Sequence, residues 1–367
     1  MWTYQLNRLR KIALALVCIC LCVFASACQG NGRSPVSRMQ RTPLAKDTNQ
    51  SETRNQGLVV QQQQRATPTP TVPTTLNSGS PFYFAMGSEA NGALRTPLVQ
   101  QAPVKMLTSW YAGHSDLAWI TSWHSSFIPS LYARGYTLQL VVWDGGEPKA
   151  NFNTAYGPAC GIPYPVSSQF LQDMILLAKT FQGNGPLYVS LFAEFSTYTC
   201  VNNHWVGNEN YYMALKDQYR AALSIFHTYA PNSRVSICWG SWLSEYDIPS
   251  VFGGRSFINK FSDIMSISDF QSFQSMNTEG NVDDVLNMTT ILHRWGKVLL
   301  SYYWSSPTTF ISDVYTMFTD TYMAKVMANG LFGFGFMKND DLSAPNSPLS
   351  FVVNAVKRYA RSKSAFQ

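Results

Sequence analysis

After Ser80 the chain alternates between short runs suited to buried β-strands and longer runs in which apolar residues recur with a helical period. The eight expected strands are Phe82–Met86, Val104–Tyr111, Thr137–Trp143, Pro186–Phe195, Arg234–Gly240, Asp263–Asp269, Lys297–Trp304 and Leu331–Met337. The clearest expected helices are Leu117–Arg134, Ser167–Phe181, Tyr211–Tyr229, Val282–Trp295, Ser312–Asn329 and Ser350–Arg361. This alternation predicts a parallel sheet covered by helices. Residues 80–367 suit one (β/α)8 barrel, a fold of about 250 residues, and a doubly wound open sheet is the alternative.

The fourth expected strand distinguishes an inner face from an outer face. Every second residue from Leu187 to Phe195 is apolar, whereas the intervening positions include Ser190 and Glu194. The apolar face is expected to contact the helices. Glu194 would then point into the barrel at the C-terminal end of its strand, where barrel enzymes build their active sites.

The first 28 residues have the pattern of an export segment. A basic stretch precedes the apolar run Ile12–Ala25, and small residues follow up to Cys28. The run is shorter than a membrane span, which needs about 20 residues. The pattern resembles a bacterial lipoprotein signal, in which Cys28 is acylated; an ordinary cleaved signal or an uncleaved anchor is the alternative. Residues 29–79, rich in Gln, Thr and Pro, are expected to form a disordered linker that tethers an extracellular, lipid-anchored domain.

Composition and charge exclude some classes of function. The chain is 46% hydrophobic, which is ample for a large core, and its net charge is only +6. Much of that charge lies before Ser80, so the barrel region has no basic stripe that would neutralise phosphates, and we expect no nucleic-acid partner. No histidine, cysteine or carboxylate spacing is typical of a metal site, and no nucleotide or dinucleotide motif occurs, so no metal or cofactor is expected.

Three cysteines, Cys160, Cys200 and Cys238, follow the export segment. An oxidising compartment would allow a disulfide between two of them. Cys238 falls within an expected strand, whereas Cys160 and Cys200 fall in loops that should lie at the same end of the barrel. We therefore expect a disulfide between Cys160 and Cys200.

The position of Glu194 leads to a family resemblance. A glutamate that ends strand four resembles the acid/base of the large clan of (β/α)8 glycoside hydrolases (clan A), whose catalytic residues end strands four and seven. Within that clan the chain is most similar to glycoside hydrolase family 26, the β-mannanase family. The matching segments are Trp205, Tyr212–Arg220, Ile237–Trp242 and Ile264–Phe270. The resemblance implies hydrolysis of a β-linked polysaccharide with Glu194 as general acid/base.

The chain departs from this family at the reacting centre. Ser190 and Ala193 stand where the family has Arg and His before its acid/base. The family's seventh strand ends in a nucleophilic glutamate, but Val298–Ser305 contains no carboxylate. A retaining mechanism needs two carboxyl groups about 5 to 5.5 Å apart. The usual partner of Glu194 is therefore missing.

Three explanations remain open for this difference. Glu194 could act with Asp269, at the end of the expected sixth strand, or with Asp144, at the end of the third, and such a pair would suit inversion through a water molecule. Tyr302 or Tyr303 could be the nucleophile assisted by Glu194, an arrangement known for sialidases. Alternatively, the barrel has lost hydrolysis and is a non-catalytic lipoprotein that only binds glycans.

Aromatic residues recur at the expected strand ends, where flat rings can cover the apolar faces of sugars. Besides Asp144, the expected substrate-binding residues are Trp110, Trp143, Trp239, Trp242, Tyr303 and Trp304. Packing in the core is the competing interpretation for each single ring. The sequence therefore predicts a monomeric barrel at the cell surface whose partner is a polysaccharide or oligosaccharide, either as a glycosidase or as its inactive relative.

Overall fold

The structure, a computed structural model, describes residues 82–360, except 88, 247–255, 278–280, 338–341 and 343–346. The expected signal segment with Cys28 and the expected linker, 29–79, lie outside the described residues. Within the described part of the chain, no helix is both long enough and apolar enough to cross a membrane.

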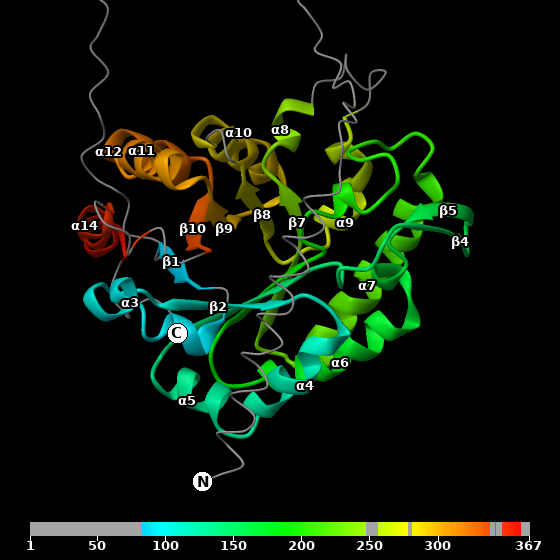
Figure 1. The fold of residues 1–367 in the computed structure, drawn as a ribbon, viewed down its shortest axis with the longest axis horizontal. Coiled ribbons are helices and arrows are strands. Elements are labelled where there is room, and N and C mark those ends of the chain that lie inside the picture. The colour runs from blue at the N-terminus through cyan, green and yellow to red at the C-terminus, as the bar shows by residue number, and fades with distance from the viewer. Residues whose placement is uncertain are drawn as a thin grey trace, which may run out of the picture. The chain divides into compact units, whose positions relative to one another are not determined.

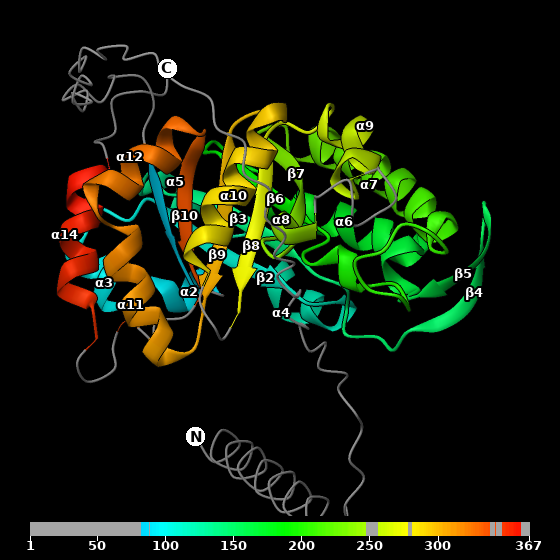
Figure 2. The same ribbon diagram turned by 90° about the horizontal axis from the view of Figure 1, so that it is seen from above.

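Eight parallel strands close into a barrel (Figure 1, Figure 2). They are β1 (Tyr83–Met86), β2 (Met106–Tyr111), β3 (Thr137–Val142), β6 (Leu187–Leu191), β7 (Ser233–Gly240), β8 (Gln271–Met276), β9 (Val298–Trp304) and β10 (Leu331–Phe336). The first strand pairs with both β2 and β10, and this pairing closes the ring. The predicted (β/α)8 fold is therefore confirmed, and the open-sheet alternative is wrong.

Helices surround the barrel on its outer side (Figure 1). They are α2 (Ala90–Ala93), α3 (Pro97–Gln101), α4 (Leu117–Ile120), α5 (Phe127–Ala133), α6 (Ser168–Phe181), α7 (Glu209–Tyr229), α8 (Leu243–Tyr246), α9 (Ser262–Met265), α10 (Val282–Leu292), α11 (Pro307–Met317), α12 (Asp320–Ala328) and α14 (Leu349–Tyr359). The side chain of Ser167 caps α6 by accepting a hydrogen bond from the Phe170 amide. Two expected helices are divided in the structure: Leu117–Arg134 contains α4 and α5, and Ser312–Asn329 contains parts of α11 and all of α12.

The sixth strand lies later in the chain than the sequence pattern predicts. Residues 263–269 form most of α9 and the turn after it, and β8 begins at Gln271. Asp269 therefore precedes its strand instead of ending it. This shift moves the residue to the N-terminal end of the barrel.

The barrel interior has two apolar layers with polar side chains between them. The layer at the N-terminal end is formed by Tyr83, Ala85, Met106, Phe270 and Leu299, with Tyr188 and Phe332 packed against it. The layer at the C-terminal end is formed by Val141, Ala193, Cys238 and Tyr302, with Trp110, Trp143, Met276 and Met337 packed against it. Between the layers, Thr108 donates a hydrogen bond to Gln139, and the Ser190 and Ser301 hydroxyls lie 2.8 Å apart.

A β-hairpin that the sequence pattern did not predict follows β3. Its strands, β4 (Ala150–Thr154) and β5 (Gly157–Gly161), extend away from the barrel beside α7 (Figure 2). A disulfide joins Cys160 of this hairpin to Cys200, the pair expected from the sequence, and the Ile162 amide donates to the Tyr198 carbonyl. Cys238 is a buried free thiol. The hairpin is thus tied to the loop that follows β6.

Candidate active site

Glu194 lies in a loop whose backbone conformation is unusual. Strand β6 ends at Leu191, and Phe192 and Glu194 then adopt left-handed φ angles of 57° and 64°. Such a conformation costs a non-glycine residue about 1 to 3 kcal/mol and persists only where the surroundings enforce it. Here the Ala193 amide still donates to the Val142 carbonyl of β3, while the Phe192 ring stacks on Phe170 of α6.

This change of backbone direction determines which side chains face the barrel. Up to Leu191 the alternation is as predicted, because Leu187, Val189 and Leu191 belong to the hydrophobic core between the strands and the surrounding helices. We call this core the outer core. After it, Phe192 joins the outer core, whereas Ala193 joins the inner layer near the C-terminal end. The Glu194 carboxylate lies beside that inner layer, where it accepts a hydrogen bond from the Tyr302 hydroxyl at 3.3 Å.

The surroundings of Glu194 favour its protonated form. Burial raises the pKa of this carboxyl, the Tyr302 hydrogen bond opposes the rise, and the negative charge of Asp144 adds to it. A carboxyl that keeps its proton to higher pH is suited to donate that proton to a leaving group.

Asp144 lies two residues after β3, on a turn that two glycines make possible. Its Oδ1 accepts a hydrogen bond from the Gly146 amide at 2.7 Å, and Gly145 and Gly146 have φ angles of 84° and 69°. A side chain on Gly145 would collide with the Tyr164 ring, since its Cβ would lie 2.9 Å from Cδ1. Burial raises the pKa of Asp144, and the Gly146 hydrogen bond lowers it. Asp144 is thus a largely buried carboxyl whose charge acts on Glu194.

The predicted role of Asp269 is contradicted by its position. Asp269 accepts a hydrogen bond from the Val235 amide at 2.8 Å, at the beginning of β7, and its carboxylate contacts His227 Nε2 at 2.8 Å. These contacts hold it at the N-terminal end of the barrel, opposite Glu194. It therefore stabilises the beginnings of β7 and β8, and it is too far along the barrel to share a substrate with Glu194.

The two tyrosines proposed as nucleophiles occupy different environments. Tyr303 faces outward, because a bulge in β9 turns both Ser301 and Tyr302 inward, and its hydroxyl donates to Asp313 of α11. Tyr302 contacts Glu194, but burial and the nearby Glu194 charge raise its pKa well above that of a free phenol. In the arrangement of sialidases a glutamate assists the tyrosine, and the hydrogen bond between Tyr302 and Glu194 is of that kind. The nucleophilic role of Tyr302 therefore stays a prediction, whereas the outward position of Tyr303 contradicts that role.

The aromatic residues predicted to bind substrate divide into inner and outer groups. Trp110 and Trp143 pack against the inner layer beside Glu194, and Trp110 lies against the Tyr302 ring with a centroid distance of 4.4 Å. Trp304, half-buried, is the last residue of β9. Trp239 is fully buried among Phe195, Phe257 and Phe261 in the outer core, and this position contradicts its predicted role in substrate binding. The outward position of Tyr303 contradicts the same predicted role for that residue. Trp242 packs against the same outer core and donates through Nε1 to Asn203.

Polar side chains of the barrel interior were not predicted as part of the site. Gln274 of β8 is fully buried, and within the described part of the chain neither of its amide atoms has a hydrogen-bond partner, nor do Gln139 Nε2 and Trp110 Nε1. The sequence Gln271–Met276 could have indicated these polar side chains, because polar residues recur in it at alternate positions, as expected for a strand that faces a polar barrel interior. Among the described residues, no group of three or more His, Cys, Asp or Glu side chains is arranged to hold a metal ion.

No protein-family model matches the sequence, and no curated protein matches it. Among solved structures, the chain is similar to a psychrophilic glycoside hydrolase family 10 endo-β-1,4-xylanase, at 9% identity over 76% of this chain and 97% of that chain, with a TM-score of 0.49. It is also similar to a fungal β-1,4-galactanase, at 12% identity over 70% and 89% of the two chains, with a TM-score of 0.47. A third is the catalytic domain of β-amylase from Paenibacillus polymyxa, at 10% identity over 77% and 100%, with a TM-score of 0.48. Likenesses this remote say nothing about the chemistry of the site, so the roles of Glu194 and Asp144 depend on their own geometry.

Proposed function

We propose that the protein is a glycoside hydrolase that acts on a β-linked polysaccharide, with Glu194 as the proton donor. One observation carries this proposal: Glu194 is held in a left-handed conformation at the C-terminal end of the barrel, with a pKa raised by burial and by Asp144. The strain and the raised pKa both act against stability, and such combinations concentrate at functional sites. The resemblance of Glu194 to the acid/base of family 26 supplies the reaction class.

Asp144 is the second carboxylate of this proposal. It is the neighbouring acid whose charge acts on Glu194, whereas β9 has no carboxylate in its sequence. Such a pair suits an inverting mechanism, in which the second carboxylate activates a water molecule that lies between carboxyl groups about 6.5 to 9.5 Å apart. Trp110 and Trp143 would cover the apolar face of the sugar bound between these carboxyls.

The same proposal includes export and attachment to a membrane through an acylated Cys28, with residues 29–79 as the tether. A polysaccharide too large to enter a cell is accessible to a monomeric enzyme held at the cell surface. The disulfide between Cys160 and Cys200 supports export, because such bonds persist in oxidising compartments.

The test is the release of reducing ends from mannan, xylan, galactan and β-glucan by the wild type and by Glu194→Gln. Glu89→Gln is the matched control, since Glu89 is an exposed glutamate in the loop after β1 at the same end of the barrel. We expect hydrolysis of at least one polysaccharide by the wild type and the control, and its loss in Glu194→Gln. Equal hydrolysis by all three proteins would show that Glu194 is not the acid.

A second function is favoured by the sequence of β9, which lacks the carboxylate that clan members carry on that strand. The barrel would then bind glycans without cleaving them. Calorimetric titration of the wild type with oligosaccharides separates the two functions. Heat of association without any new reducing ends would favour the binding protein, whereas measurable turnover would exclude it.

A further inference from the structure

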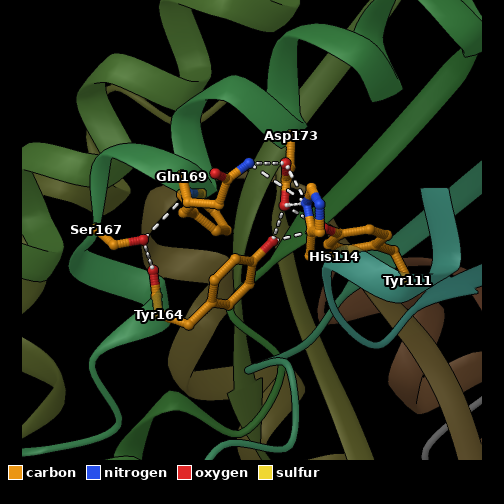
Figure 3. A network of polar contacts seen from close by, with 7 residues as sticks. Tyr111, His114, Tyr164, Ser167, Gln169 and Asp173 are labelled. Atoms are coloured by element: carbon orange, nitrogen blue, oxygen red, sulfur yellow. Dashed lines mark hydrogen bonds and ion pairs between the residues drawn. The ribbon is translucent and has the colours of Figure 1, made fainter.

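A buried carboxylate outside the proposed catalytic pair holds an exposed histidine (Figure 3). Asp173 of α6 is fully buried, whereas the side chain of His114 is 64% exposed. The Nδ1 atom of His114 lies 3.0 Å from Asp173 Oδ1. The Tyr111 and Tyr164 hydroxyls each donate to Asp173 Oδ2 at 2.7 Å, and Gln169 donates to Oδ1 at 2.8 Å.

These contacts determine which nitrogen of His114 carries the proton. Burial raises the pKa of Asp173, but its four side-chain hydrogen bonds together lower the pKa below the ordinary value, so Asp173 is ionised. An ionised carboxylate only accepts hydrogen bonds, and its two oxygens offer about four acceptor sites. His114 must therefore donate through Nδ1. In the neutral ring, Nε2 is then left with its lone pair as a hydrogen-bond acceptor.

The cluster also packs against the turn that contains Asp144. His114 begins the short 3-10 helix that follows β2, so it lies at the same end of the barrel as Glu194. The preceding Gly113, with a φ of 131°, approaches Gly145 so closely that a Cβ would lie 2.7 Å from the Gly145 Cα. The Tyr164 ring also lies close to Gly145. The residues around His114 thus also pack against Gly145, the residue that follows Asp144.

We propose that His114 is a substrate-binding residue whose Nε2 accepts a hydrogen bond from a hydroxyl group of a neutral sugar unit, next to the unit bound at Asp144. Asp173 is its positioning residue. The inference rests on the proposed function, because it extends the same substrate along the C-terminal end of the barrel. A purely structural cluster would not need His114 to be exposed.

The tautomer of His114 tests the geometry without any substrate. Nitrogen-15 NMR of the full chain at pH 8, where imidazole is ordinarily neutral, distinguishes a protonated Nδ1 from a protonated Nε2. The His114→Ala variant assigns the signal among the five histidines. We expect Nδ1–H for His114, and the opposite tautomer would overturn the inference whatever the enzyme does.

The binding role is tested with β-1,4-linked hexasaccharides of mannose, xylose, glucose and galactose. We expect His114→Ala to raise KM about three- to tenfold, the effect of one lost hydrogen bond, with kcat within about twofold, because the contact is made equally before and during reaction. His124→Ala is the matched control, since His124 is another exposed histidine of the connection between β2 and β3 and is not among the residues that contact Asp173. Because His114 is exposed, its substitution should not prevent folding.

The outcomes separate the inference from the proposed function. If the wild type hydrolyses a hexasaccharide and His114→Ala has an unchanged KM, the inference fails and the function stands. If the wild type binds a hexasaccharide without cleaving it and His114→Ala binds it several-fold more weakly by calorimetry, the function fails and the inference stands. If no hexasaccharide binds, both are overturned.

Discussion

The two ends of the barrel use carboxylates in opposite ways. Asp269, at the N-terminal end, accepts a hydrogen bond from a strand amide and contacts a histidine, and it lies before its strand in an ordinary turn. Glu194, at the C-terminal end, has one hydrogen bond of 3.3 Å, a left-handed backbone and a raised pKa. The first carboxylate is held by two protein partners, whereas the second is held by one long hydrogen bond. Chemistry is expected where the fold keeps an acid in a strained and buried place, because such a place is not explained by stability.

The largest effect is expected from the carboxyls at the C-terminal end. Removing a general acid or base typically costs a factor of about 10² to 10⁴ in rate, so Glu194→Gln and Asp144→Asn should each lower kcat by about that factor. The measurement is the initial rate on the best polysaccharide, together with the anomeric form of the first product by NMR. Inverted product supports Asp144 as the base. Retained product, or an Asp144→Asn variant at the wild-type rate, would remove Asp144 from the pair.

At the other end, substitution should affect stability and leave catalysis unchanged. Asp269→Ala leaves the Val235 amide without its carboxylate partner, which costs about 1 to 3 kcal/mol when the amide is buried. Denaturant unfolding should show this loss, while kcat and KM of the folded protein stay at wild-type values. A fall in kcat comparable to that of Glu194→Gln would abolish the distinction between the two ends.

Glu194→Gln should also stabilise the protein at neutral pH, by roughly 1 kcal/mol, the usual size of such gains. Because the pKa of Glu194 is raised in the folded state, the folded protein binds more protons than the unfolded chain between the unfolded and folded pKa values. Stability is therefore lost as pH rises through that window, and a neutral glutamine avoids the loss. Unfolding curves at pH 4 and pH 7 should show the gain only at the higher pH. A gain of equal size at both would disprove its electrostatic origin.

The smallest effect is expected from the hydroxyl that contacts the acid. The Tyr302 hydrogen bond lowers the pKa of Glu194, so Tyr302→Phe should raise that pKa. The alkaline limb of the pH profile of kcat/KM, where the acid loses its proton, should then move to higher pH. Tyr303→Phe, which removes a hydroxyl facing α11, is the control and should leave the limb in place. A shift to lower pH would show that Tyr302 does not stabilise the charged form.

The barrel was predictable because its outer face obeys a simple rule. Val189 and Leu191 must be apolar to contact the helices, and the same pattern recurs on seven of the eight strands at nearly the predicted places. The sixth strand was misplaced for the opposite reason. Gln271–Met276 contains few apolar residues, because Ser272 and Gln274 face a polar interior. Ile264 and Met265 of α9 are apolar and therefore gave this helix the sequence pattern of a buried strand.

The site was less predictable because its side chains depend on local departures from regular strands. The left-handed turn at Phe192 places Ala193 inside and Phe192 outside, against the alternation. The bulge in β9 likewise turns Tyr303 away from the barrel. Counting positions along a strand cannot detect either departure. The His114 and Asp173 cluster joins residues 59 apart, and a scattered histidine gives no sign of such a partner in sequence.

The bond between Cys160 and Cys200 gives the loop beyond Glu194 a dependence on the redox chemistry of its surroundings. That loop is fastened to the β4–β5 hairpin by the disulfide and by the hydrogen bond between Ile162 and Tyr198, whose own hydroxyl donates to the carbonyl next to Glu194. Glutathione in a cytosol would leave the two thiols apart and the loop held by weaker forces. The loop beyond Glu194 is therefore expected to reach its tied conformation only in an oxidising space.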